Sequence, residues 1–255
     1  MKLIFLGTAG GRFMTITQKR ATGGTILEMD GEIIHIDPGP GALVRAKEFG
    51  FNLKSLTGVL ITHAHPDHYT DAEFVIIAMT KGGKKKCGFL LANDHVINGS
   101  MDGRYRPVVS TYVLNLLDEH KIMKPGDMFK IGKIDITAVR AKHGEPKALG
   151  FVIKGSSTIG LTGDGEYYEG MADAFKGCDY LLVNCLRPRE LKWPEHMNSE
   201  GATKLISQVR PKLAVLKDIG MKMIEGVAEK EAKWIEENTG VKTIVARDGM
   251  RITNT

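Results

Sequence analysis

One stretch of the chain, residues 60–71, constrains its fold and its chemistry more than any other. It reads Leu-Ile-Thr-His-Ala-His-Pro-Asp-His-Tyr-Thr-Asp, and its apolar start is typical of a buried strand that ends in a loop. His63 and His65 lie two apart on extended backbone, so both rings project from the same side and can bind one cation. Asp67 and His68 follow a proline that bends the chain, so they point elsewhere and suit a second cation. A histidine-rich surface turn without metal is the alternative, and such dense spacing of ligand residues argues against it.

Length and composition predict an ordinary globular protein. At 255 residues the chain is long enough for one large domain, and residues 1–255 are predicted to form it. Apolar residues make up 42% and charged residues 25%, no apolar run approaches the roughly 20 residues that cross a bilayer, and residues 1–7 indicate a first strand rather than a signal peptide. Three cysteines argue against a disulfide framework, so the expected location is the reducing cytoplasm, without membrane association.

The charge of the chain weakly favours an anionic partner. The formal net charge is +5 and the isoelectric point is near 9.0. The dense basic cluster surrounds two glycines and consists of Lys81, Lys84, Lys85 and Lys86. Such a run is usually a solvated loop, and contact with a phosphate group is the alternative.

Short apolar runs bounded by glycine, proline or aspartate predict a fold rich in strands. The predicted strands are residues 2–6, 25–29, 32–36, 58–61, 87–91, 135–140, 149–154, 158–161, 179–184, 213–216 and 241–246. The predicted helices are residues 42–49, 72–80, 108–120, 199–209 and 225–238. Two mixed sheets packed face to face, with helices outside, would bury these runs. The expected fold class is therefore α/β (α+β), a four-layer αββα sandwich.

The His-x-His-x-Asp-His loop resembles the signature of the metallo-β-lactamase superfamily, the αββα-sandwich hydrolases. The resemblance extends over most of the chain. It implies a site for two metal ions at the edge of two packed sheets, with a bridging water as nucleophile. His143 and Asp164, each at the end of a predicted strand, match the third histidine and the bridging aspartate of the family. Asp37 matches an aspartate that lies behind the metal-binding histidines and orients one of them.

The resemblance assigns these residues to two ions. The first ion would be bound by His63, His65 and His143, and the second by Asp67 and His68, with Asp164 between the two. Zinc is the expected ion, and manganese or iron are alternatives, above all at the second site. Two such ions ~3.5–4 Å apart would lower the pKa of a shared water and offset charge on the attacked centre. Asp67 and Asp164 are therefore also predicted to be catalytic.

The chain departs from the family pattern at the last expected ligand. The superfamily usually completes the second site with a histidine in a Leu-Thr-His-Phe-Gly-like loop, whereas residues 213–221 have Asp218 at that place. Either Asp218 ligates through oxygen, which favours manganese or iron over zinc, or the second ion is weak or absent. Ligation is the favoured alternative, so Asp218 joins the predicted metal ligands.

A further histidine, His196, precedes the predicted helix 199–209. The sequence His-Met-Asn-Ser there looks like the His-(Leu/Met/Ser)-Ser/Thr element of the ribonuclease Z-like branch, in which the histidine handles the scissile phosphate or the leaving group. This resemblance implies that His196 is catalytic, as a general acid or a phosphate contact. An ordinary histidine before a helix is the alternative. His95 and His120 are interpreted as surface or packing residues.

Three functions remain open on the sequence. The favoured one is a hydrolase that uses a metal-activated water on a phosphodiester of a small or cyclic nucleotide-like substrate. In the tRNA-processing members of the branch, a long arm separates the third histidine from the bridging aspartate; here only two short strands do, so a small anionic substrate is expected rather than structured tRNA. The alternatives are an ester, thioester or lactone hydrolase, and a metal-binding protein without turnover. Residues 100–126 are expected to overhang the site and help choose the substrate, and a homodimer is left open.

Overall fold

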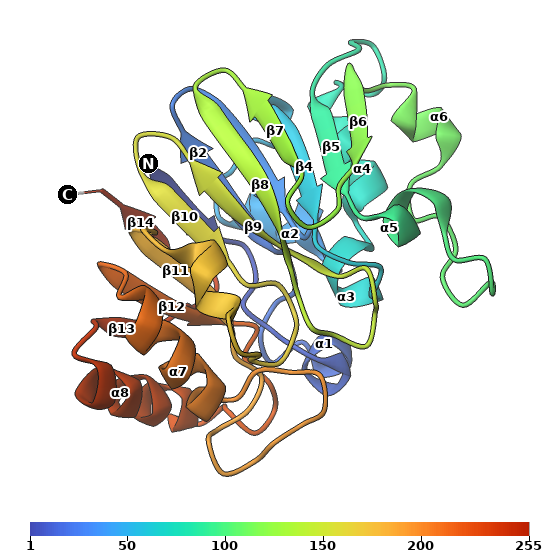
Figure 1. The fold of residues 1–255 in the computed structure, drawn as a ribbon. Helices are drawn as coiled ribbons and strands as arrows, with labels where there is room; N and C mark the ends of the chain where they lie inside the picture. Colours follow the sequence, from blue (N-terminus) through green and yellow to red (C-terminus); the bar gives the residue numbers. More distant parts are fainter. Residues whose placement is uncertain (255) are drawn as a thin grey trace.

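The computed structural model describes residues 1–254 and folds them into two seven-stranded sheets that face each other (Figure 1). The first sheet consists, in spatial order, of β14 (Arg251–Thr253), β1 (Lys2–Phe5), β2 (Thr25–Met29), β3 (Glu32–Ile36), β4 (Gly58–Ile61), β5 (Phe89–Ala92) and β6 (Glu119–Ile122). The second consists of β13 (Thr243–Val245), β12 (Leu213–Lys217), β11 (Tyr180–Asn184), β10 (Thr158–Leu161), β9 (Leu149–Lys154), β8 (Ile134–Arg140) and β7 (Met128–Ile131). Each half of the chain therefore builds one sheet, except that β14 returns to pair with β1.

A tight turn fixes the register of the β2–β3 hairpin. Asp30 and Gly31 have φ values of 51° and 92°, and positive φ at both central residues is what a type I′ turn requires. Met29 consequently pairs with Glu32 directly across the turn. The two strands predicted on either side of this Asp-Gly pair, residues 25–29 and 32–36, are confirmed and form a hairpin.

Strand direction brings several loops to one edge of the sandwich. Strands β3 to β6 are parallel to one another, and so are β10 to β13. Strands β7 to β10 form an antiparallel meander, so β8 and β10 run in the same direction. The carboxyl ends of parallel strands meet at one edge of a sheet, and ligands in open α/β sheets bind there.

The core between the sheets is built from aliphatic and aromatic side chains of both halves. Phe5 from β1, and Phe151 from β9, are completely buried. Phe89 of β5 packs on Phe129 of β7 with 5.0 Å between the ring centroids. Each such buried side chain contributes about 1.5–3 kcal/mol, so this layer holds the two sheets against each other.

Helices cover the outer face of each sheet (Figure 1). Over the first sheet lie α2 (Ala42–Glu48), η1 (Leu53–Ser55), α4 (Ala72–Met79), α5 (Asp94–Asn98) and α6 (Thr111–Leu114). Over the second lie η2 (Met171–Phe175), α7 (Ser199–Val209) and α8 (Val227–Thr239). The short helices α1 (Arg12–Thr17) and α3 (Pro66–Tyr69) belong to loops. The predicted α/β class and the four-layer αββα arrangement are confirmed. Within residues 1–254, no helix has both the length and the apolarity needed to cross a membrane.

The helix predicted over residues 108–120 is wrong over most of its length. Helix α6 covers only four residues of it, and β6 begins at Glu119. Strand β6 pairs in parallel with β5, with Leu91 opposite Lys121, so sheet hydrogen bonding outweighs the apolar spacing that indicated a helix. Helix α1 and the edge strands β7 and β14 were not predicted, because segments of three to six residues are too short for a clear periodic signal.

Candidate metal centre

The predicted ligand residues lie at the carboxyl ends of strands from both sheets. His63 and His65 follow β4, whereas His143 follows β8 and Asp164 follows β10. In each of three groups of these side chains, one possible ligand atom from every residue lies within 4.8 Å of those of the others. The groups are His63, His65 and His143; His63, His68 and Asp164; and His143, Asp164 and His196. The structure therefore brings six of the predicted residues together between the two sheets.

Three imidazoles form the first group. His65 Nδ1 lies 3.0 Å from His63 Nε2 and 3.1 Å from His143 Nε2. The outer nitrogens of these two partner rings are occupied, because His143 Nδ1 donates to the Glu195 carbonyl at 2.9 Å and His63 Nδ1 lies 3.0 Å from the Thr62 hydroxyl. With protons on Nδ1, both rings turn an Nε2 lone pair toward His65. One proton on His65 Nδ1 cannot satisfy both contacts well, so a shared cation fits this group better than hydrogen bonds do.

Asp37 orients two of the histidines from behind. Its Oδ1 accepts a hydrogen bond from the Thr62 backbone N–H at 2.7 Å. Its Oδ2 accepts from the Thr62 hydroxyl at 2.9 Å and from His68 Nδ1 at 3.1 Å. Because the Thr62 hydroxyl donates its proton to Asp37, its oxygen accepts from His63 Nδ1. Asp37 therefore fixes His68 directly and His63 through Thr62, with both Nε2 atoms toward the site.

One carboxylate oxygen of Asp164 is hydrogen-bonded to Asn184, and the other faces the histidines. Its Oδ1 accepts a hydrogen bond from the Asn184 side-chain amide at 2.7 Å. Its Oδ2 lies 3.5 Å from His68 Nε2 and 3.7 Å from His196 Nδ1. Asp67 Oδ2 is 3.9 Å from the same His68 nitrogen, so Asp67 stands at the margin of the second group. One oxygen of Asp164 is thus placed between the imidazoles of two groups.

Burial and neighbouring charges set the protonation of the site. Burial, reinforced by His68, lowers the pKa of His63 well below its usual value, and burial lowers the pKa of His65 to about 4. Burial would also lower the pKa of His68, but the surrounding carboxylates, Asp164 first, outweigh it and raise this pKa well above the usual value. His68 in turn holds the pKa of Asp164 well below its ordinary value, against the effect of burial. His63 and His65 are therefore neutral near pH 7 and offer lone pairs, while His68 must release a proton when a cation binds.

His196 reaches the site from the loop between β11 and α7. This loop turns tightly, because Trp193 and His196 pair as an isolated β-bridge. Glu195, at the tip of the turn, has a φ of 64° and gives its carbonyl oxygen to His143. The His196 ring packs on the His143 ring with 4.8 Å between centroids, and its side chain keeps 19% exposure. His196 thus combines contact with the cluster and access to solvent, and burial, opposed by Asp164, lowers the pKa of its ring.

Asp218 follows β12 and lies behind Asp164. Its Oδ2 accepts a hydrogen bond from the Asn184 amide, and its Oδ1 is 3.4 Å from Lys217 Nζ. Among residues 1–254 it belongs to none of the three convergent groups of ligand atoms. Ligation of a metal by Asp218, expected from the sequence, stays a prediction.

Asn184 and Lys217, which sequence reasoning missed, complete this part of the site. The Asn184 amide nitrogen donates to both Asp164 and Asp218, while its oxygen accepts from Lys217 Nζ at 3.1 Å. The Lys217 side chain is only 5% exposed. Burial would lower the pKa of Lys217, but Asp218 and neighbouring carboxylates raise it, whereas burial raises the pKa of Asp218 to about 7. The ammonium is therefore the more persistent charge of this pair. Asn184 ends β11, which pairs with β10, and Lys217 ends β12, which pairs with β11; these strand-end positions were the available signal.

One aromatic side chain from residues 100–126 lies at the rim of the site. The Tyr105 ring centroid is 6.1 Å from that of His65 and 5.2 Å from that of His95, on which it stacks. The Tyr105 hydroxyl is buried and has no hydrogen-bond partner within the described part of the chain. His95 contacts the fully buried Glu145 through Nδ1 at 2.5 Å, so it has a packing role, as interpreted from the sequence. His120 lies exposed on β6.

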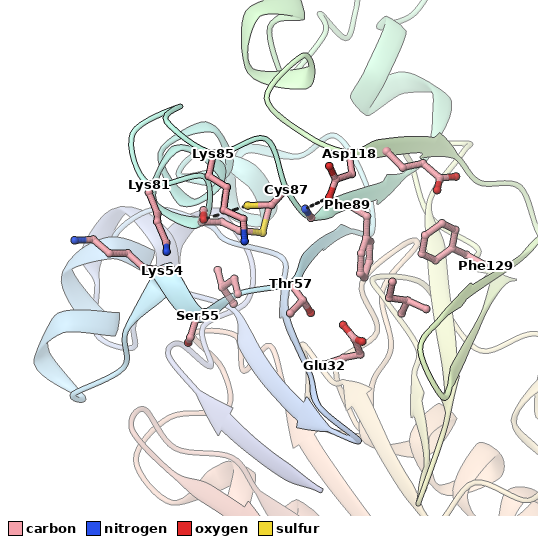
Figure 2. A pocket seen from close by; sticks show the side chains of 15 residues that line it. Glu32, Lys54, Ser55, Thr57, Lys81, Lys85, Cys87, Phe89, Asp118 and Phe129 are labelled. Carbon is pink, nitrogen blue, oxygen red and sulfur yellow. Dashed lines mark hydrogen bonds between the residues drawn. The ribbon is translucent and has the colours of Figure 1, made fainter.

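The basic cluster lies away from this centre. Lys81 and Lys85, together with Lys54, line a cavity of about 400 Å³ (Figure 2). Thr57 and Gly88, which also line it, precede β4 and β5, whereas the histidine loop follows β4. The two places are separated by the length of the strands, about 13 Å for four residues. The basic cluster is therefore not part of the metal centre, and its contact with a phosphate group stays the alternative to a solvated loop.

Known proteins match both the sequence and the fold. A family model described as a Beta-lactamase superfamily domain matches residues 33–217. An uncharacterized protein of Methanocaldococcus jannaschii is 37% identical over 255 residues, covering 99% of this chain and 94% of that protein. Ribonuclease Z of Pyrococcus abyssi is 27% identical over 158 residues, covering 60% of this chain and 48%, about half, of that enzyme. The metallo-β-lactamase fold protein YhfI of Bacillus subtilis has a TM-score of 0.78 at 19% identity, covering 98% of both chains.

The family match runs from β3 to the end of β12. It includes every residue of the three convergent groups and stops at Lys217, one residue before the departure at Asp218. The match covers more than half of the chain, and the order of the strands gives the two-sheet sandwich of the same fold. The chain therefore belongs to the metallo-β-lactamase superfamily of metal-dependent hydrolases, with ribonuclease Z among its sequence relatives.

Proposed function

We propose that this protein is a metal-dependent hydrolase that cleaves a small anionic phosphodiester. The observation that carries the proposal is the position of His196, whose Nδ1 lies 3.7 Å from Asp164 Oδ2 at the edge of the imidazole cluster. When a phosphodiester of an ordinary alcohol is cleaved, the alcohol group departs as an alkoxide that needs a proton. A partly exposed histidine can deliver that proton. The sequence similarity to ribonuclease Z supports the same bond type.

The donor set fits divalent ions. In this proposal His63, His65 and His143 hold the first ion, and Asp67, His68 and Asp164 hold the second. When bound, such ions supply Lewis acidity, which lowers the pKa of a water and offsets negative charge on the attacked phosphorus. The group of three imidazoles suits zinc, and the group that contains carboxylates also suits manganese or iron.

Side chains of the protein orient the metal ligands and supply the proton in this proposal. Asn184 holds Asp164 Oδ1, so only Oδ2 of this carboxylate faces the reacting centre. Asp37 holds the ring of His68 in one orientation. His196 lies where it can give its proton to the departing oxygen, and Glu195, which precedes it, ties the loop to His143.

The short connection between His143 and Asp164 favours a small substrate. The hairpin of β9 and β10 is closed by residues 155–157 only, so no arm for holding structured tRNA is present between these two residues. The Tyr105 ring narrows the rim beside His65. A cyclic or short nucleotide-like phosphodiester meets these conditions.

Parallel assays of two substrate classes test the proposal. The metal-free protein is loaded with zinc or manganese in turn and given bis-p-nitrophenyl phosphate or an acyl thioester. Metal-dependent release of nitrophenol, well above the thioester rate, is the expected result. Turnover of the thioester alone would replace the proposal with an acyl hydrolase, and metal binding without turnover of either would replace it with a metal-binding protein.

The role of His196 gives a sharper prediction. We expect His196→Ala to lower kcat by about 10²-fold on a dinucleotide, whose leaving group needs a proton, and by much less on bis-p-nitrophenyl phosphate. The physical reason is that nitrophenolate departs as a stable anion. His120→Ala, on the exposed face of β6, is the matched control and should leave both rates unchanged. Equal losses on the two substrates would show that His196 is not the proton donor.

A further inference from the structure

We propose that Lys217, Asn184 and Asp218 form a buried charged network that keeps the second metal position weak, so that the second ion exchanges freely while the first stays bound. This inference rests on the ligand assignment proposed above, and it concerns residues of this chain that depart from the family pattern. The network lies at the ends of the adjacent strands β11 and β12, directly behind Asp164.

Asn184 connects the network to the metal centre. Its amide nitrogen donates to Asp164 Oδ1 at 2.7 Å and also to Asp218 Oδ2. Its carbonyl oxygen accepts from Lys217 Nζ at 3.1 Å. The orientation of the Asn184 amide is thus fixed by Lys217, and Asp218 occupies the second of its two donor positions.

Asp218 is committed to this network rather than to a metal. Its Oδ1 lies 3.4 Å from Lys217 Nζ and its Oδ2 accepts from Asn184. Turning the carboxylate toward an ion would leave a buried ammonium without its counter-charge, and such a buried, unpaired charge is costly. The second ion is therefore left with Asp67, His68 and Asp164 and gains no donor from Asp218.

The Lys217 ammonium also opposes a second divalent ion by charge. Its side chain is 5% exposed, so solvent and salt screen it poorly. It lies on the far side of Asn184 from Asp164, the carboxylate that faces both ions. A second ion would therefore add two positive charges close to one that is already fixed. The fraction of protein with a second ion bound then rises with the free metal concentration. The rate of hydrolysis rises with that fraction.

Zinc titration of the metal-free protein tests this inference without measuring activity. Isothermal titration and the zinc content after dialysis should show one tight ion, and a second that binds roughly 100-fold more weakly. Lys217→Gln removes the charge and can still donate to Asn184, and Lys217→Met removes charge and donor. Both variants should tighten the second ion by about tenfold or more, because the repulsion is gone. Lys130→Gln, on the exposed edge strand β7, should change neither ion.

The outcomes separate this inference from the proposed function. Two equally tight ions in the natural protein, or a second ion unaffected by Lys217→Gln, would overturn it. A change in Lys217→Met alone would mean that the lysine acts through its hydrogen bond to Asn184 rather than by charge, and would overturn it as well. Failure of the natural protein to bind even the first ion would instead overturn the metal centre. Thermal melting of each variant confirms that the fold is retained.

Discussion

Replacing His65 by alanine is expected to reduce hydrolysis by on the order of 10³-fold or more, and to remove the tightly bound ion. His65 Nδ1 lies between the Nε2 atoms of His63 and His143, at 3.0 and 3.1 Å. Without His65, only two of the three imidazoles that would bind the first ion remain. The measurements are kcat/KM on bis-p-nitrophenyl phosphate and the metal content of the dialysed protein.

The control for this prediction is a histidine that takes no part in the cluster. His120→Ala removes an imidazole from the exposed strand β6, so both metal content and rate should stay at the natural level. A His65→Ala protein that keeps its ion and its activity would show that the three-imidazole group is not the reactive centre.

Asp164→Asn is expected to weaken both ions and to lower kcat/KM by about 10²–10³-fold. The substitution preserves volume but removes the negative charge that lies 3.5 Å from His68 Nε2. Asn184 would still donate to the remaining carbonyl oxygen, which turns the new amide nitrogen, a donor, toward the site. The amide N–H group is a hydrogen-bond donor and cannot bind a cation, so both ions bind more weakly. Zinc titration together with steady-state kinetics measures the two effects.

An exposed aspartate serves as the comparison. Asp173 lies on η2 at the surface, in an ion pair with Lys176, and Asp173→Asn removes the same charge far from the cluster. Surface ion pairs of this kind contribute little, so this protein should behave as the natural one does. Equal behaviour of the Asp164 and Asp173 variants would contradict the assigned role of Asp164.

Much of the fold could be predicted because local signals agreed with the tertiary structure. The hairpin at Asp30-Gly31 and the helix capped by Asn198 each had turn or cap chemistry that fixes a boundary. The segment between Val108 and His120 failed because its apolar spacing indicated a helix, whereas pairing with β5 is a contact distant in sequence. Edge strands of three or four residues gave no pattern long enough to be recognised.

The candidate site was predicted in the same uneven way. His63, His65 and His68 occupy one short motif, and the family resemblance located His143 and Asp164, all of which the fold brings together. The partners behind them could not be predicted. Asn184 and Lys217 reach the site only because β11 pairs with β10 and β12 pairs with β11, and local sequence does not determine strand order. Asp218 was recognised as a departure, but its contact with Lys217 depends on how both side chains are buried.

Anomalous X-ray scattering at the zinc absorption edge, on crystals of the protein loaded with zinc, would locate the ions directly. We expect a peak surrounded by ring nitrogens of His63, His65 and His143, each about 2.0–2.1 Å from the ion. A second, weaker peak beside His68 and Asp164 should grow with the zinc concentration. Crystals without a peak among the three imidazoles, or with those rings turned apart toward solvent, would contradict the account.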